Sequence, residues 1–449
     1  MKTKDMTKGD PVKVILLFAV PLLIGNIFQQ VYNIVDTMAA GYNLGDSAIA
    51  AIGATSSLFS VLVDFASGMN SGFGIIIARS YGAKDHENLK KSIASSLVLN
   101  IITTVLITAG ALVFLKPLLH VLNVPAEIFD DAYIYIFIII AGMISRILYN
   151  MCAGILRAVG NSRTPLYFLI FSSMLNLAMD FALIMGVHMG VAGAALATVI
   201  AETASAVLSG IFIMRKYSDI LPSRRHFTWD KELMQDMLST GFSMAMMLCI
   251  VDLGSVLYQR AINNLGGTLI VAHTSARKII GIFMMPISSI ATANSTFVSQ
   301  NRGAKEYERI RSSLGKVLII ETGWSVFSCI LAFLFGASAV HYLTNTTDPE
   351  VIANAVLSIR LHFLFYPSLG ILLALRTTMQ AMGEKIAPVI SSGFELAFKV
   401  LAGFILIPSF GYIWVCLTEP VVWTVCMIFL IIWYLVKNPV RKAMNAEGE

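Results

Sequence analysis

Residues 13–41 read KVILLFAVPLLIGNIFQQVYNIVDTMAAG, a mostly apolar run with few polar side chains. A helix of about 20 apolar residues crosses the hydrocarbon core of a bilayer, so this run is long enough to span it. It is too long for the apolar core of a signal peptide, and no small-residue cleavage site follows it. We therefore expect it to form a transmembrane helix that stays in the mature chain.

Apolar runs of this kind recur along the whole sequence, and there are twelve in all. Their approximate limits are 13–41, 48–79, 91–119, 128–156, 163–186, 190–216, 233–262, 268–299, 312–340, 352–381, 386–408 and 411–437. Only helices and closed barrels satisfy every backbone polar group inside lipid, and these runs are too long and too uniformly apolar for barrel strands. The sequence thus predicts an all-α polytopic membrane protein with twelve transmembrane helices.

The composition excludes several classes of protein. Apolar residues make up 57% of the chain and charged residues 13%, whereas soluble proteins carry about 25% charge. This argues against a soluble enzyme, a disordered protein and a nucleic-acid binder.

The basic residues predict the orientation of the chain in the membrane. Nearly all Lys and Arg residues in the connections between the apolar runs fall on one side of the membrane, and only Lys116 and Arg260 fall on the other side. By the positive-inside rule we expect both termini to be cytoplasmic.

Short motifs repeat between the two halves of the chain. Asn43-Leu44-Gly45 recurs as Asn264-Leu265-Gly266, and Gly82-Ala83-Lys84 recurs as Gly303-Ala304-Lys305, both at an offset of 221. Six apolar runs lie in the first half of the chain and six in the second half. Because six is an even number, both halves begin on the same side and have the same orientation in the membrane. This arrangement is a parallel repeat, related by a pseudo-two-fold axis along the membrane normal.

The repeat predicts two six-helix lobes. We expect an N-lobe at 1–216, a cytoplasmic linker at 217–232 and a C-lobe at 233–449. Two equivalent lobes suggest a transporter that works by alternating access. The alternative is a scaffold, receptor or channel with duplicated halves.

Polar residues inside the predicted spans indicate a candidate ion site in the N-lobe. At about 1.5 Å of rise per residue, Asp36, Asp180 and Thr198 lie ~8–12 Å from the outer ends of their helices, in one layer. Asn176 lies one helical turn from Asp180 on the same face, so it joins this layer. Carboxylate, amide and hydroxyl oxygens suit a hard cation such as Na⁺, and two close carboxylates would also hold a proton. The alternative is that hydroxyl groups cap each acid within its own helix.

Other polar residues in the spans are candidates for substrate binding or gating, because intramembrane charges persist mainly where they face a partner or a cavity. Glu395 and Lys399 have the i, i+4 spacing of a helical ion pair, which could lock helices together or bind substrate. Pro21 could let the first helix bend below Asp36. The full set of such candidates is Gln29, Tyr32, Pro21, Asp64, Glu202, Asp252, Arg277, Glu395 and Lys399.

Motifs for ATP hydrolysis, for a metal centre and for a catalytic nucleophile are missing from the sequence. The five cysteines lie in apolar runs without zinc or disulfide spacing. We therefore expect no enzymatic activity and no cofactor, and we expect an ion gradient to supply the energy.

At this point the sequence resembles the bacterial multidrug and toxic compound extrusion (MATE) transporters over essentially its whole length. The resemblance rests on several motifs together, each weak alone. They are Pro21 with the segment Gln29–Asp36, the repeated Gly-Ala pair at Gly82 and Gly303, Leu156–Asn161 before Pro165, Asn176 with Asp180, and Gly190 through Gly193 to Thr198.

The resemblance implies an antiporter that exports cationic, often aromatic compounds in exchange for Na⁺ or H⁺. It also implies that Asp36, Asn176, Asp180 and Thr198 form the N-lobe cation site. We accordingly expect a monomer in the bacterial cytoplasmic membrane, with small organic cations as substrates and no nucleic-acid partner. A flippase for an anionic lipid-linked precursor shares this fold and stays as the alternative, with Arg277, Lys278 and Lys399 as its relevant bases.

Overall fold

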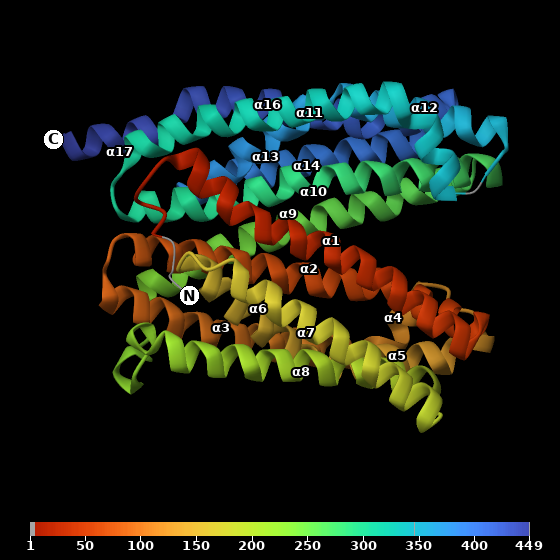
Figure 1. Ribbon diagram of the computed structural model, residues 1–449, viewed down its shortest axis with the longest axis horizontal. Coiled ribbons are helices and arrows are strands. Elements are labelled where there is room, and N and C mark those ends of the chain that lie inside the picture. Colours follow the sequence, from red (N-terminus) through yellow and green to blue (C-terminus); the bar gives the residue numbers. More distant parts are fainter. Residues whose placement is uncertain (1–4, 345, 449) are drawn as a thin grey trace. The chain divides into compact units, whose positions relative to one another are not determined.

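The computed structural model describes residues 5–344 and 346–448, and every regular element in that part of the chain is a helix (Figure 1). In the first half the elements are α1 (Pro11–Leu44), α2 (Asp46–Gly82), α3 (His86–Val113), α4 (Leu115–Val121), η1 (Ala126–Ile128), α5 (Phe129–Ala141), α6 (Met143–Ala158), α7 (Arg163–Asp180), η2 (Phe181–Gly186), α8 (Gly190–Lys216), η3 (Ser218–Ile220) and η4 (Arg224–His226).

In the second half they are α9 (Lys231–Asn263), α10 (Gly267–Gly303), α11 (Tyr307–Thr344), α12 (Pro349–Leu364), α13 (Tyr366–Ala381), α14 (Ile386–Leu401), η5 (Ala402–Leu406), α15 (Ile407–Phe410), α16 (Tyr412–Lys437) and α17 (Pro439–Gly448). Within the described residues, ten helices are long and apolar enough to cross a bilayer. Two bent pairs, α5 with α6 (43°) and α12 with α13 (48°), bring the number to twelve if each pair is one span. The predicted all-helical fold with twelve spans is confirmed.

The chain forms two compact units. Residues 20–245 lie in unit 1, whereas residues 6–19 and those from Met246 onward lie in unit 2. Two helices therefore pass from one unit to the other: α1 leaves unit 2 at Ala19, and α9 leaves unit 1 at Ala245. The lobe limits expected from the sequence stay a prediction, and the segment 217–245 belongs to unit 1 in the structure.

Each unit has the same internal packing. In unit 1, α2 packs against α3, α5 and α6, and α8 packs against α5, α6 and α7. In unit 2, α10 packs against α11, α12 and α13, and α16 packs against α12, α13 and α14. The backbone repeats as well, because left-handed φ angles occur at Gly45 and Gly266, at Lys84 and Lys305, and at Gly190 and Gly411. The internal repeat thus extends from sequence to local conformation.

Aspartates cap the start of several helices. Asp10 accepts a hydrogen bond from the Lys13 amide at 3.0 Å, directly before Pro11 at the first position of α1. This hydrogen bond lowers the pKa of the Asp10 carboxyl, and the nearby Lys316 ammonium lowers it further. Asp85 caps α3 in the same way. These caps define where the helices begin at the predicted cytoplasmic end.

Two glycines of α2 allow a close approach to the first part of α9 within unit 1. A Cβ atom at Gly72 would lie 2.4 Å from the Cα of Gly241, and one at Gly68 would lie 2.4 Å from the Cα of Ala245. The obstructing atoms are backbone, so no side-chain rotation could relieve the clash. Small residues at such crossings let membrane helices pack backbone to backbone.

We expect Gly72→Ala to destabilise unit 1 by about 1–3 kcal/mol, the range for overpacked sites, because α2 and α9 must move apart. The control is Gly74→Ala, since Gly74 lies in the same helix with open space around it. Alanine is the better helix former, so the control should be neutral or slightly stabilising. Thermal unfolding of the purified protein measures both, and equal melting temperatures for the two variants would contradict this packing.

Candidate functional site

Helices α1, α7 and α8 of unit 1 bring together a layer of polar side chains. Asp36 and Tyr32 come from α1, Asn176 and Asp180 from α7, and Thr198 from α8. Asp180 is the last residue of α7, and the π-helix η2 follows it directly. Such π-turns are frequent at functional sites. We call these five residues the polar layer.

Asn176 lies at the centre of the polar layer. In the orientation of its amide that satisfies its neighbours, the nitrogen donates to Asp36 Oδ1 and to Asp180 Oδ2, each at 3.2 Å. The same nitrogen contacts the Tyr32 hydroxyl, and the amide oxygen accepts from the Thr198 backbone N–H at 3.0 Å. Tyr32 also donates to Asp36 Oδ1 at 3.4 Å. One amide therefore links the two carboxylates, although they belong to different helices.

The layer has an unused acceptor. Asn176 and Asp180 are only 2% and 4% exposed. Asp180 Oδ1 is buried and accepts no hydrogen bond from any residue that the structure describes. A buried acceptor without a donor is costly, so a ligand that supplies positive charge would stabilise it. The described residues contain no cluster of three or more His, Cys, Asp or Glu side chains that could hold a metal ion. The layer instead offers two carboxylates and neutral oxygens, which fit Na⁺ or a proton.

Several candidates from the sequence lie elsewhere in the structure. Pro21 is buried inside α1 next to the point where the helix passes between the units, and Gln29 is exposed on the same helix. Asp64 is half-buried on α2, and no hydrogen bond or ion pair among the described residues joins it to the polar layer. Asp252 is half-buried on α9.

Glu202 forms an ion pair with a residue that the sequence analysis did not consider. The Arg146 Nε of α6 donates to Glu202 Oε1 at 2.7 Å, and the Arg146 guanidinium lies 4.7 Å from the centre of the Phe59 ring. This pair joins α6 to α8 inside unit 1. Arg146 could have been found from the sequence, because it is a charged residue inside an apolar run. Intramembrane charges persist mainly where they face a partner or a cavity, and this rule applies to arginine as well as to the acids.

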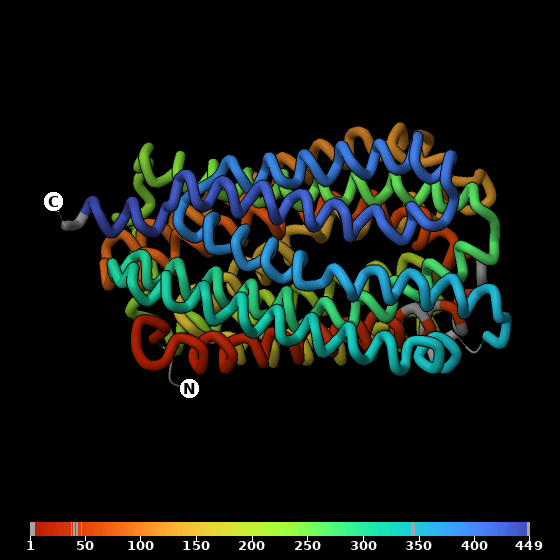
Figure 2. The backbone as a smooth tube through the Cα atoms, turned by 90° about the horizontal axis from the view of Figure 1, so that it is seen from above, coloured from red at the N-terminus to blue at the C-terminus, as the bar shows by residue number. Residues whose placement is uncertain are grey.

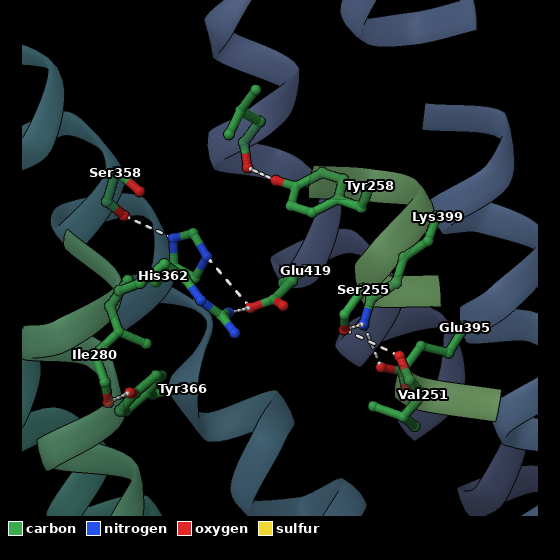
Figure 3. Close-up of polar contacts among 12 residues, drawn as sticks. Val251, Ser255, Tyr258, Ile280, Ser358, His362, Tyr366, Glu395, Lys399 and Glu419 are labelled. Carbon is green, nitrogen blue, oxygen red and sulfur yellow. Dashed lines mark hydrogen bonds and ion pairs between the residues drawn. The ribbon is translucent and has the colours of Figure 1, made fainter. Parts of the chain in front are cut away.

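Unit 2 carries a charged side chain at the position equivalent to Asn176. Lys399 of α14 precedes the π-helix η5, just as Asn176 precedes η2. Its ammonium donates to Glu395 Oε1 at 2.9 Å and to Ser255 Oγ at 3.2 Å, as Figure 3 shows. Lys399 is only 2% exposed. The chain therefore supplies its own buried cation here, next to a carboxylate.

A second ion pair of unit 2 is formed by Glu419, whose carboxylate Figure 3 also shows. Glu419, which stands 221 residues after Thr198, accepts from Arg277 Nη1 at 2.5 Å. His362 Nε2 lies 3.6 Å from the same Glu419 oxygen, while His362 Nδ1 donates to the Ser358 carbonyl at 2.8 Å.

The sequence analysis missed the roles of His362 and Glu419. Glu419 was visible as an acid in an apolar run, but its partners come from α10 and α12, far away in the sequence. The Trp423 ring packs edge to face beside His362, and the Tyr366 ring packs against the Trp423 ring in turn. In unit 2 each of these buried acids thus has a basic partner, whereas the two acids of the polar layer share one neutral amide.

Comparison with known proteins agrees with this architecture. The family model MatE matches residues 21–182 and again residues 243–405. The chain is 28% identical to the probable multidrug resistance protein YoeA of Bacillus subtilis, over 90% of this chain and 89% of the relative. It is 25% identical to the multidrug export protein MepA of Staphylococcus haemolyticus, over 97% of both chains.

Solved structures share the fold. The crystal structure of MATE in the bent conformation superimposes with a TM-score of 0.91 at 22% identity, and the match covers all of both chains. An outward-facing multidrug resistance MATE transporter of the MOP superfamily matches with a TM-score of 0.88. The resemblance seen in the sequence is confirmed, and because the family model matches both halves, the chain belongs to the MatE family of multidrug and toxic compound extrusion transporters.

Proposed function

We propose that the chain is a secondary antiporter that exports cationic amphiphilic organic compounds in exchange for Na⁺ or H⁺. The observation that carries the proposal is the polar layer, where Asn176 links Asp36 and Asp180 and where Asp180 Oδ1 has no donor among the described residues. The names of the relatives, a multidrug resistance protein and a multidrug export protein, support the substrate class.

The mechanism follows from charge. With neither ion nor substrate bound, two ionised carboxylates repel each other across Asn176, and any cation lowers this energy. A bound Na⁺ or proton neutralises one of them and so reduces the attraction for an organic cation. Ion and substrate therefore compete, and each favours the state of the transporter that binds it more tightly. The coupling is reciprocal, so the inward ion gradient can drive the substrate outward.

The Tyr32 hydroxyl and the Thr198 hydroxyl supply neutral oxygens to the same layer. Thr198 Oγ1 already donates to the Ala194 carbonyl at 3.1 Å, which leaves its lone pairs free to accept a hydrogen bond or to contact a cation. Tyr32 can rotate its hydroxyl to donate to Asp36 when no ion is bound. We propose that both groups complete the ion's coordination shell.

The same proposal places the protein in the bacterial cytoplasmic membrane with both termini in the cytoplasm. The basic connections support this orientation. A flippase for an anionic precursor receives less support, because two of its three expected bases, Arg277 and Lys399, are each bound to a buried glutamate, and only the exposed Lys278 has no such pair among the described residues. Bases that are paired in this way offer little charge to an anionic substrate.

The test is efflux of ethidium from proteoliposomes with Na⁺ and pH gradients imposed separately. The proposal predicts efflux under at least one gradient, and that gradient names the coupling ion. Absence of efflux of any organic cation under either gradient would contradict the proposal and favour the flippase.

A further inference from the structure

A groove in unit 2 lies between the start of α11, the end of α16 and the short helix α17. Its volume is about 610 Å³, which is within the usual size range of small-molecule sites. Figure 2 shows α17 extending the chain beyond the end of α16, and α17 packs against α11. The positive-inside rule assigns this end of the unit to the cytoplasm, so the groove opens at the membrane surface.

The rim of the groove is basic. Arg311 of α11 and Arg441 of α17 line it, and both are exposed. One carboxylate is close to them: Glu308 lies 3.9 Å from Arg311, with both side chains about 70% exposed. An exposed pair at this distance is weak, so it leaves most of the arginine's attraction for an anion. The amide side chains of Asn438 and Asn445 add hydrogen-bond donors.

The wall of the groove is apolar. Leu314 and Leu318 line it from α11, Tyr434 from α16, and Val440 and Met444 from α17. The α17 helix has an apolar side, where Val440 is only 2% exposed, and a polar side that carries Arg441 and Lys442. A short amphipathic helix with basic residues on its polar side is typical of a segment that lies in the membrane interface.

We propose that this groove binds one anionic phospholipid of the cytoplasmic leaflet, with the phosphate at Arg311 and Arg441 and the first part of an acyl chain along the leucines. Basic pockets between membrane helices on the cytoplasmic side suit anionic headgroups. The combination of a basic rim and an apolar wall fits an amphiphile with a negative head, whereas free phosphate would leave the wall unused.

Gly315 makes a precise test available. It lies in α11 on the lining of the groove, and a Cβ atom added there would meet open space. Leucine at this position should project into the groove and obstruct its apolar wall, and it should also favour the helix, since glycine is a poor helix former. Loss of lipid in Gly315→Leu could then not be attributed to misfolding, and an unchanged melting temperature in lipid-free detergent checks this.

The experiment is native mass spectrometry of the full-length protein titrated with dioleoyl phosphatidylglycerol, dioleoyl phosphatidylcholine or glycerol phosphate. We expect one tight phosphatidylglycerol, weakened about 30-fold by the double variant Arg311→Gln/Arg441→Gln, which is the effect of two basic groups at an anionic surface. Gly315→Leu should weaken this binding by obstructing the path of the acyl chain. Arg215→Gln/Arg224→Gln, which changes two exposed arginines of unit 1, should keep it.

Three results would overturn the proposal. They are equal affinity for phosphatidylcholine, equally tight binding of glycerol phosphate without acyl chains, and unchanged phosphatidylglycerol binding in both groove variants. Ethidium efflux in proteoliposomes tests the transport function separately. The lipid site can therefore be disproved while the antiport function stands, and the antiport function can be disproved while the lipid site stands.

Discussion

Asp180→Asn is expected to abolish ion-driven efflux, because it removes the coupling between ion and substrate, which is usually worth about 5–150-fold in affinity for linked sites. The variant keeps the shape of the side chain but removes the charge on the carboxylate that Asn176 links to Asp36. A neutral amide resembles the protonated acid, so the variant should stay in the ion-bound condition at every pH. Efflux of ethidium from proteoliposomes, under defined Na⁺ and pH gradients, measures this loss.

The control is Asp219→Asn, the same chemical change at an exposed position of the linker. It should transport like the original protein. If Asp180→Asn also transported normally, at equal abundance in the membrane, the polar layer would not couple ion and substrate.

Arg277→Met is expected to destabilise unit 2 by about 1–3 kcal/mol, the range for leaving a buried polar group without its partner, because Glu419 is buried although Arg277 is partly exposed. It leaves the Glu419 carboxylate, which is 8% exposed, with His362 as its nearest basic neighbour at 3.6 Å. Glu419→Leu should be milder, because the arginine left behind has a side chain that is 45% exposed and can reach water. Thermal unfolding in detergent ranks the two variants.

The double variant Arg277→Met/Glu419→Leu should recover much of the loss, since an apolar pair can replace a buried ion pair at little cost. Arg260→Met, at an exposed arginine of the same unit, is the matched control and should be close to neutral. If the Arg277→Met protein were as stable as this control, the Arg277–Glu419 ion pair would not stabilise unit 2.

The helices could be predicted from the sequence because bilayer thickness sets their length. The run at 128–156 shows the limit of this rule: the structure bends it by 43° into α5 and α6, a detail that apolar length cannot reveal. The amphipathic helix α17 was not predicted, because the rule looks for long apolar runs and this helix is short and basic.

The polar layer could be placed from helical rise alone, since Asp36 and Asp180 were each counted from a helix end. Partners that come from other helices could not be predicted in this way. Asn176 as the link between the two acids depends on how α1 and α7 pack, and the Arg277–Glu419 pair depends on how α10 meets α16. The Glu395–Lys399 pair was visible because both residues lie on one helix, four positions apart.

The most direct test of the account is the affinity of the purified transporter for tetraphenylphosphonium, measured by calorimetry over a series of Na⁺ concentrations and pH values. Competition at the polar layer predicts that the apparent Kd rises with Na⁺ or with acidity, and that Asp180→Asn binds weakly and shows no dependence on either. An affinity that is independent of both ions in the original protein, or an unchanged ion dependence in Asp180→Asn, would contradict it.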